Sequence, residues 1–281
     1  MRTLVIGMGL IGGSFALALR RCGLSDEIWG VESSPENAAE AIKLGLADRI
    51  VTLEEGFPQA DLTVLSVPAD AMPLLAIKLL NKVRNNQIIM DTGSIKTELC
   101  EVISQHPSRG RFVATHPMWG TEYSGPSAAR NDAFTGRTAV ILEQDKSDAD
   151  ALAFVKNIYE SFGMKAIFMA DGEEHDLHAA YVSHISHITS FALALTVLEK
   201  EREEQHIFDL AGGGFESTVR LAKSSAATWV PILMKNKYNV LDVLREHIHQ
   251  LQVFRKMLET DNAEGLTDTI HRANAIRRII K

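Results

Sequence analysis

The 281-residue chain is poor in cysteine, in basic blocks and in long apolar runs. Cys22 and Cys100 are its two cysteines, and neither a disulfide framework nor a cysteine-based zinc spacing is present, which fits a reducing compartment. Lysine and arginine number 29 against 36 aspartates and glutamates, and the net charge of −7 argues against a nucleic-acid partner. No apolar run reaches the roughly 18 residues that a membrane-spanning helix needs, and a strand pattern begins at once, leaving no signal peptide. These absences predict a cytoplasmic protein with no nucleic-acid or membrane partner.

Hydrophobic residues make up 46% of the chain, which is enough for a sizeable core spread over two domains. In the N-terminal part, short apolar or β-branched runs alternate with helical patterns. The predicted strands are Thr3–Ile6, Glu27–Val31, Leu62–Val67, Gln87–Met90, Arg111–Thr115, Thr138–Leu142 and Lys165–Met169. The predicted helices cover residues 14–21, 71–80, 95–104 and 148–161, and a further helix opens at Pro35. This alternation predicts a Rossmann-type α/β domain, with a parallel sheet covered by helices on both faces.

The pattern changes near Ala170-Asp171-Gly172, after which no strand is predicted. Long helical patterns then cover residues 175–200, 239–260 and 263–279. We therefore expect a dinucleotide-binding domain over residues 1–170 and an all-α substrate and dimerisation domain over residues 171–281. The helices carry more Leu, Ile and Ala than a thin monomeric bundle needs, which favours a homodimer.

A glycine pattern lies between the first predicted strand and the first predicted helix. Gly7, Gly9 and Gly12 form G-x-G-x-x-G, with Leu10 and Ile11 inside it. The first glycine permits a tight turn, the second lets the backbone approach a pyrophosphate, and the third lets helix and strand pack closely. The amides of the helix N-terminus face the phosphates, so these five residues are predicted to bind a dinucleotide.

Polar residues at the ends of three strands extend this predicted site. Glu32 follows Gly12 by 20 residues, where a carboxylate accepts hydrogen bonds from ribose hydroxyls and repels a 2′-phosphate. This position predicts NAD as the cofactor rather than NADP; the alternative is that Glu32 is an ordinary solvated strand-end residue. Ser66, Pro68 and Ser94 follow two other strands, at the crevice where such sheets bind ligands. We assign all three to the cofactor site, with Ser94 at the nicotinamide; Ser94 is also a candidate N-cap of the next helix.

Histidine and arginine supply the candidate chemical groups. His116 follows a predicted strand of the same sheet, where an imidazole is suited to act as acid or base near neutral pH. His184 and His187 share one face of a predicted helix. Because no cysteine or acidic ligand accompanies them at a known spacing, a buried polar pair or a substrate contact is favoured over a metal site. Arg220 follows a glycine-rich kink and offers a guanidinium that matches a carboxylate, but taken alone it would be a surface residue.

Five segments, in order over nearly the whole chain, carry a family resemblance. They are GMGLIGGS at 7–14, DTGSIK at 91–96, HPMWGTEYSGP at 116–126, SHISH at 183–187 and GGGFESTVR at 212–220. In these segments the chain resembles the prephenate and arogenate dehydrogenases of tyrosine biosynthesis. The resemblance implies NAD-dependent oxidative decarboxylation of prephenate to 4-hydroxyphenylpyruvate, or of arogenate to tyrosine.

The resemblance also implies roles for single residues. His116 would polarise the ring hydroxyl of the substrate, and Ser94 would contact both that histidine and the nicotinamide. Arg220 would bind the ring carboxylate. The other residues implied for the substrate site are His187, Thr121, Glu122 and Gly213.

The chain departs from the family pattern at two positions. Trp119 stands where alanine is common, and we expect its ring to reshape the pocket mouth. Ser217 replaces a common aspartate, which puts an ionic gate built on that carboxylate in doubt. No mutase or regulatory segment is recognised, so no fused domain is expected. Two other functions stay open: a β-hydroxyacid-type dehydrogenase that uses a lysine such as Lys223, and a catalytically idle NAD-binding sensor that needs neither His116 nor Arg220.

Overall fold

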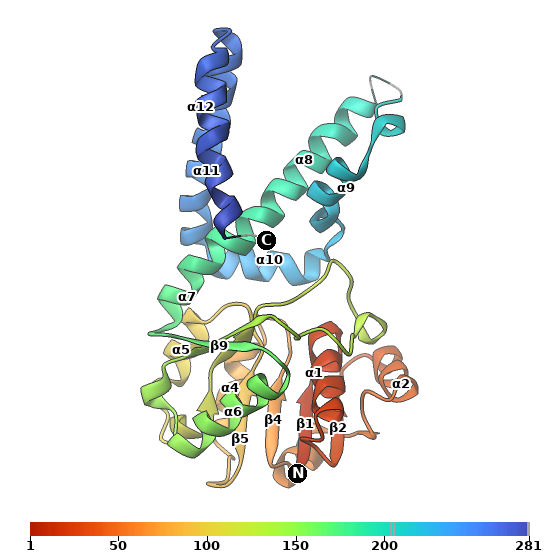
Figure 1. The fold of residues 1–281 in the computed structure, drawn as a ribbon. Helices are drawn as coiled ribbons and strands as arrows, with labels where there is room; N and C mark the ends of the chain where they lie inside the picture. The colour runs from red at the N-terminus through yellow and green to blue at the C-terminus, as the bar shows by residue number, and fades with distance from the viewer. Residues whose placement is uncertain (203, 205, 280–281) are drawn as a thin grey trace. The chain divides into compact units, whose positions relative to one another are not determined.

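The computed structural model describes residues 1–202, 204 and 206–279 (Figure 1). Its N-terminal part contains a six-stranded parallel sheet with the order β3-β2-β1-β4-β5-β6. The order reverses between β1 and β4, so the carboxyl ends of these strands open the crevice in which such sheets bind ligands. The predicted Rossmann-type sheet is confirmed. Its strands are β1 (Arg2–Ile6), β2 (Glu27–Val31), β3 (Arg49–Ile50), β4 (Leu62–Leu65), β5 (Ile88–Asp91) and β6 (Phe112–Val113).

Helices cover both faces of this sheet because its strands are apolar on both sides. In β1, Val5 belongs to one buried cluster while Leu4 and Ile6 belong to the other, as the alternation of side chains along a strand requires. The first cluster includes Phe15 of α1 and Tyr159 of α6, and the second contains residues of α4 and α5. The helices of this part are α1 (Leu10–Arg21), α2 (Pro35–Lys43), α3 (Leu53–Gly56), α4 (Met72–Leu80), α5 (Thr97–Ile103) and α6 (Ala149–Ser161).

A second, three-stranded sheet corrects the prediction of a single parallel sheet. It has the order β7-β8-β9, with β7 (Thr115–Pro117) antiparallel to β8 (Thr138–Leu142) and β8 parallel to β9 (Lys165–Met169). Backbone pairing with β5 ends at Val113 of β6. The N–H of Thr115 then donates to the side chain of Asp91 at 3.0 Å and not to the backbone of β5. His116 therefore lies within β7 of the second sheet, and its predicted position at a strand end of the nucleotide-binding sheet is wrong.

After β9, every described element is helical. The helix predicted over residues 175–200 begins earlier and contains a π-helical turn: α7 (Gly172–Ala179), η5 (Ala180–His184) and α8 (Ile185–Glu201). Insertions of this kind are frequent at functional sites. Two helices that the sequence did not predict follow, α9 (Gly213–Val219) and α10 (Ala226–Lys235). Short 3₁₀ turns lie at Phe57–Gln59, Arg109–Arg111, Pro126–Ala128, Gln144–Lys146, Phe208–Leu210, Arg220–Lys223 (η7) and Asn274–Arg278.

The continuous helical stretch Gly172–Glu201 is long and apolar enough to cross a membrane, by length and composition alone. The expectation that no segment reaches this level is therefore wrong for this stretch. Only 17% of its most apolar 18-residue window is buried, and Leu195 and Leu198 of α8 are about half exposed. The same stretch carries four histidines, of which His175 and His184 are buried and His178 is exposed. Exposed apolar residues along one helix are typical of a surface that another element or chain covers.

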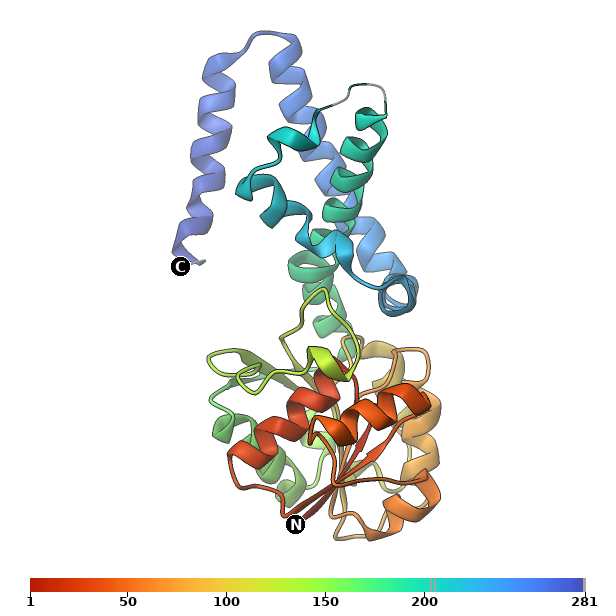
Figure 2. The same cartoon turned by 90° about the vertical axis from the view of Figure 1, so that its right-hand side faces the viewer.

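The chain divides into two compact units, Met1–Asn236 and Lys237–Lys281. In the second unit, α11 (Lys237–Glu259) and α12 (Ala263–Ala273) form a helical hairpin (Figure 2). Asn262 caps α12 by accepting a hydrogen bond from the N–H of Gly265 at 2.9 Å. The sequence predicts a different division, into an α/β domain over residues 1–170 and an all-α domain over residues 171–281. This division stays a proposal.

Candidate active site

The turn between β1 and α1 has the geometry that its glycines predict. Gly7 has a φ of +92°, and a Cβ atom there would lie 2.3 Å from the carbonyl oxygen of Ser66. A Cβ atom on Gly12 would lie 1.9 Å from the Gly7 carbonyl oxygen. Gly9, the N-cap of α1, has open space beside it, and Leu10 begins the helix. The turn is therefore closed where strand and helix pack and open where a pyrophosphate would approach the helix N-terminus.

Glu32 is tied to this turn. One carboxylate oxygen accepts the N–H of Met8 at 2.9 Å, and the other accepts the N–H of Ser34 at 3.1 Å. These contacts hold the partly exposed carboxylate directly after β2, and its role in binding a ribose stays a prediction. Ser66 follows β4, and its hydroxyl contacts that of Thr92 at 3.0 Å, which links the ends of β4 and β5. Pro68 is exposed on the loop after β4.

Ser94 lies in the loop after β5, but it does not cap the next helix. Helix α5 begins at Thr97, and Lys96 occupies its N-cap position without a side-chain cap. The capping acceptor comes from far along the chain: Asp176 of α7 accepts the N–H groups of Lys96 and Thr97, each at 2.9 Å. The N-cap alternative for Ser94 is therefore wrong. Within the described residues, Ser94 also makes no hydrogen bond to His116.

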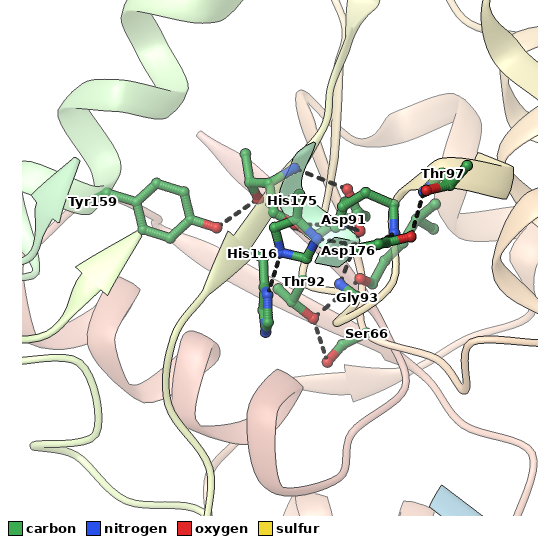
Figure 3. A network of polar contacts seen from close by, with 12 residues as sticks. Ser66, Asp91, Thr92, Gly93, Thr97, His116, Tyr159, His175 and Asp176 are labelled. Atoms are coloured by element: carbon green, nitrogen blue, oxygen red, sulfur yellow. Dashed lines mark hydrogen bonds and ion pairs between the residues drawn. The ribbon is translucent and has the colours of Figure 1, made fainter. Parts of the chain in front are cut away.

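His116 instead contacts a second histidine (Figure 3). Its Nδ1 atom lies 2.8 Å from Nε2 of His175, and Nδ1 of His175 lies 2.8 Å from a carboxylate oxygen of Asp176. His175 and Asp176 are buried, whereas His116 is partly exposed. The result is a continuous polar chain from the start of α5 to the open edge of the His116 ring.

A buried ion pair lies beside this chain. Lys96 and Asp91 are fully buried and paired, and the Lys96 ammonium also donates to the carbonyl oxygen of Thr115 at 2.5 Å. Asp91 accepts the N–H of Thr115 at 3.0 Å and that of Gly93 at 2.8 Å. The pair therefore fixes the loop that carries Ser94 against the strand that carries His116.

The surroundings favour a neutral His116, a neutral His184 and an ionised Asp176. Burial, together with the neighbouring His175 and Lys96, lowers the pKa of His116 well below 6.5. Burial also lowers the pKa of His184 to about 4. For Asp176, burial opposes ionisation, but hydrogen bonds from His175 and Thr97 outweigh it and lower the pKa. At neutral pH, His116 is therefore unprotonated and able to accept a proton.

The residues expected around the substrate form a second group. Arg220, in η7, donates to a carboxylate oxygen of Glu122 at 2.5 Å; the arginine side chain is 47% exposed and that of Glu122 is 8% exposed. His187 of α8 stacks on Trp229 of α10, with ring centroids 3.4 Å apart. The structure thus pairs Arg220 with Glu122, which lie 98 positions apart in the sequence. It also places His187 against Trp229, a residue that the sequence did not indicate. Gly213 begins α9, and Thr121 accepts the N–H of Tyr123 at 3.3 Å.

The two departures from the family pattern have structural outcomes. Trp119 packs against Phe134 at a centroid distance of 5.8 Å, next to the hydrophobic core that contains Phe15. The ring is partly buried in this position, and its effect on the pocket mouth stays a prediction. Ser217 donates to the Gly214 carbonyl oxygen at 3.0 Å, and among the residues that the structure describes, Glu122 supplies the carboxylate at Arg220.

His175, Asp176 and Lys96 were missed as site residues from the sequence. His175 was visible only as one of several histidines, and Lys96 only as part of a matched segment. Asp176 carried one signal, an acidic residue directly after a histidine. Among the residues that the structure describes, no group of three or more His, Cys, Asp or Glu side chains is arranged to hold a metal ion.

The open glycine turn, the fixed carboxylate after β2 and the neutral histidine beside the end of β5 define a dinucleotide-dependent dehydrogenase. Comparison with known proteins narrows this class. The family model for the nucleotide-binding domain of prephenate dehydrogenase matches residues 15–168, and that for its dimerization domain matches residues 171–272. The chain belongs to the prephenate dehydrogenase family.

Individual relatives agree with this membership. The prephenate dehydrogenase of Bacillus subtilis is 32% identical over 94% of this chain and 71% of its own length. The cyclohexadienyl dehydrogenase of Zymomonas mobilis is 27% identical over 99% of this chain and 95% of its own. A crystal structure of prephenate dehydrogenase from A. aeolicus, in complex with hydroxyphenyl propionate and NAD+, is 30% identical with a TM-score of 0.89 and covers 100% of this chain and 98% of its own. Family membership favours a prephenate or arogenate dehydrogenase over the β-hydroxyacid-type dehydrogenase and the catalytically idle sensor.

Proposed function

We propose that this enzyme catalyses the NAD-dependent oxidative decarboxylation of prephenate to 4-hydroxyphenylpyruvate. The observation that carries the proposal is the neutral His116, which follows Thr115 where that residue is bonded to Asp91 at the end of β5, together with the open dinucleotide-type turn after β1. The similar A. aeolicus enzyme was solved with NAD+ and with a hydroxyphenyl acid, a compound close in form to the proposed product.

The residues around the turn fit NAD. Gly9 leaves room for the pyrophosphate, the first amides of α1 at Leu10 and Ile11 would donate to it, and Glu32 would accept from the ribose hydroxyls. Ser66 and Ser94, at the ends of β4 and β5, would border the nicotinamide. When bound, NAD supplies the hydride acceptor of the reaction.

His116 would act as the general base. Its Nδ1 atom is engaged with His175, so Nε2 is the nitrogen left for the ring hydroxyl of the substrate. His116 would draw the hydroxyl proton as the ring carbon is oxidised. The ring then loses its carboxylate as carbon dioxide, the electron pair of the broken bond enters the ring, and the proton held by His116 returns to the phenolic oxygen.

The charged and polar residues opposite would orient the substrate. Arg220 would bind a substrate carboxylate with its planar fork of donors, in exchange for part of its contact with Glu122. His187 would border the substrate from its stacked position on Trp229. Thr121 and Glu122 would lie near the side-chain end of the pocket, and Gly213 would also border the substrate.

Arogenate is the second candidate substrate, because it differs only by an amino group at the side-chain end. The relative from Zymomonas mobilis carries the broader name cyclohexadienyl dehydrogenase. Parallel assays of NADH formation with prephenate and with arogenate decide between the two substrates.

We further propose a cytoplasmic homodimer. Two free cysteines fit a reducing compartment. The half-exposed leucines of α8, in a segment that matches the family's dimerization domain, favour a second copy of the chain as the partner that covers this helix.

The test of the proposed reaction is His116→Asn. An asparagine amide can still donate to His175 but cannot accept a proton in this pH range. We expect kcat for NADH formation from prephenate to fall by about 10²–10⁴-fold, the usual size of a general-base contribution, with NAD binding retained. Carbon dioxide release, measured in parallel, should fall equally. A variant with near-normal kcat, or one that loses NAD binding together with activity, would contradict the general-base role.

A further inference from the structure

We infer that His175 and Asp176 are positioning residues that fix the tautomer of His116, so that Nδ1 carries the proton and Nε2 presents the lone pair. The inference rests on the proposed general-base role of His116. It concerns a question that the reaction leaves open: an imidazole can accept the substrate proton only if the nitrogen facing the substrate is the unprotonated one.

The donor and acceptor of each hydrogen bond can be assigned starting from Asp176. Its two carboxylate oxygens accept the N–H groups of Lys96 and Thr97, each at 2.9 Å, and backbone N–H groups can only donate. Asp176 is buried at the start of α5, where the partial positive charge of a helix N-terminus stabilises an anion. An ionised carboxylate only accepts, so Nδ1 of His175, at 2.8 Å from it, must carry a hydrogen.

The proton on Nδ1 leaves Nε2 of a neutral His175 as an acceptor. Across the 2.8 Å contact, Nδ1 of His116 must then be the donor, because two lone pairs facing each other at this distance would repel. His116 is itself neutral, so its remaining nitrogen, Nε2, holds the lone pair. Each hydrogen bond in the chain thus determines the next, from Asp176 to the partly exposed His116.

The contacts of Asp176 explain why the two histidine rings can hold fixed orientations. Its side chain is bonded to α5, and its backbone carbonyl oxygen accepts from Nδ2 of Asn236 at 2.6 Å. His175 is 2% exposed and its ring packs edge-on to that of His116, with centroids 5.0 Å apart. A rotation of either ring would break a hydrogen bond of this network and leave a polar group without its partner, which opposes the rotation.

One other protonation state would satisfy the same distances. A doubly protonated His175 would donate to both Asp176 and His116, and His116 would then carry its proton on Nε2. That tautomer cannot accept the substrate proton. The ¹⁵N measurement separates the two states, because only the proposed one leaves a lone pair on Nε2 of His116.

The test combines a spectroscopic and a kinetic measurement. In protein labelled with ¹⁵N-histidine, we expect the free enzyme at neutral pH to show His116 with a protonated Nδ1 and an unprotonated Nε2. His175→Gln keeps an amide oxygen that can accept from Nδ1 of His116, whereas His175→Ala removes the acceptor. We expect His175→Ala to lower kcat by about 10²-fold with little change in the KM for NAD, and His175→Gln to restore most of the loss.

The matched control is His178→Ala, which changes an exposed histidine on the same helix and should keep wild-type kcat. A purely structural role for His175 would predict equal losses in the Ala and Gln variants, together with weaker NAD binding. The inference is overturned if the His116 lone pair is found on Nδ1, or if His175→Ala keeps wild-type kcat. Since the tautomer is read from the free enzyme, a failure of His116→Asn to lower kcat would refute the proposed base without changing the spectroscopic result.

Discussion

Protonation of His184 should destabilise the fold as the pH falls from neutral to 4. The side chain is 1% exposed, and its Nδ1 atom accepts a hydrogen bond from Nδ2 of Asn236 at 3.1 Å. Burial lowers its pKa from 6.5 to about 4. The unfolded chain therefore binds the proton more tightly than the folded one. The stability that depends on the neutral ring is present above pH 6.5 and is lost as the pH falls toward the folded pKa.

The magnitude follows from the interval between the two pKa values. An interval of this size corresponds to about 3 kcal/mol of unfolding free energy lost between pH 7 and pH 4. Burial lowers the pKa of His116 and His187 as well, so their contributions have the same sign. The measurement must therefore isolate His184 by comparing two proteins across the same pH range.

His184→Asn provides that comparison, since its amide oxygen can still accept from Asn236 but does not titrate. We expect the variant to be less stable at pH 7 and to lose about 3 kcal/mol less than the wild type on going to pH 4. Urea unfolding followed by circular dichroism at several pH values gives both slopes. The exposed His249→Asn is the matched control for the substitution itself. Parallel slopes for the wild type and His184→Asn would refute the reasoning.

Three further outcomes are expected. Glu32→Gln removes the charge opposite a 2′-phosphate, so kcat/KM with NADP relative to NAD should rise by at least about tenfold; a wild type that already uses NADP as well as NAD would overturn this assignment. Arg220→Ala should weaken use of prephenate by on the order of 2–4 kcal/mol with NAD affinity unchanged, and Arg220→Lys should recover only part of it; unchanged kcat and KM would remove Arg220 from the site. Light scattering should show a dimer at micromolar concentration, and Leu195→Glu on the exposed face of α8 should dissociate it; a monomeric wild type would contradict the proposed interface.

The sequence predicted the α/β core well because its evidence is local. Strands β2, β8 and β9 have the bounds that their apolar runs indicate, and α2 begins at Pro35 behind a Ser34 cap. The glycine turn was predicted equally well. Gly7 has a positive φ, and the Ser66 carbonyl at the end of β4 leaves no room for a side chain there. Side-chain period and backbone freedom are properties of short segments, so a single sequence displays them.

The sequence was less informative where a structural feature depends on contacts between distant segments. The helix after β5 is capped by Asp176, 80 positions from the backbone N–H of Lys96, and not by the nearby Ser94. The two-residue strand β3 and the short helices α9 and α10 were missed, because short elements depend on packing more than on their own pattern.

By itself, the sequence determined the class of fold, the dinucleotide turn and the family, and it singled out His116 and Arg220 as the groups to test. Only the tertiary structure decided that His116 lies in the second sheet, that it faces His175, and that Arg220 meets Glu122. The physical reason is that these contacts join residues 59 and 98 positions apart. A hydrogen bond between such residues needs no periodicity in either segment; it exists because packing of the α/β core and of the helices after β9 brings the two side chains within reach.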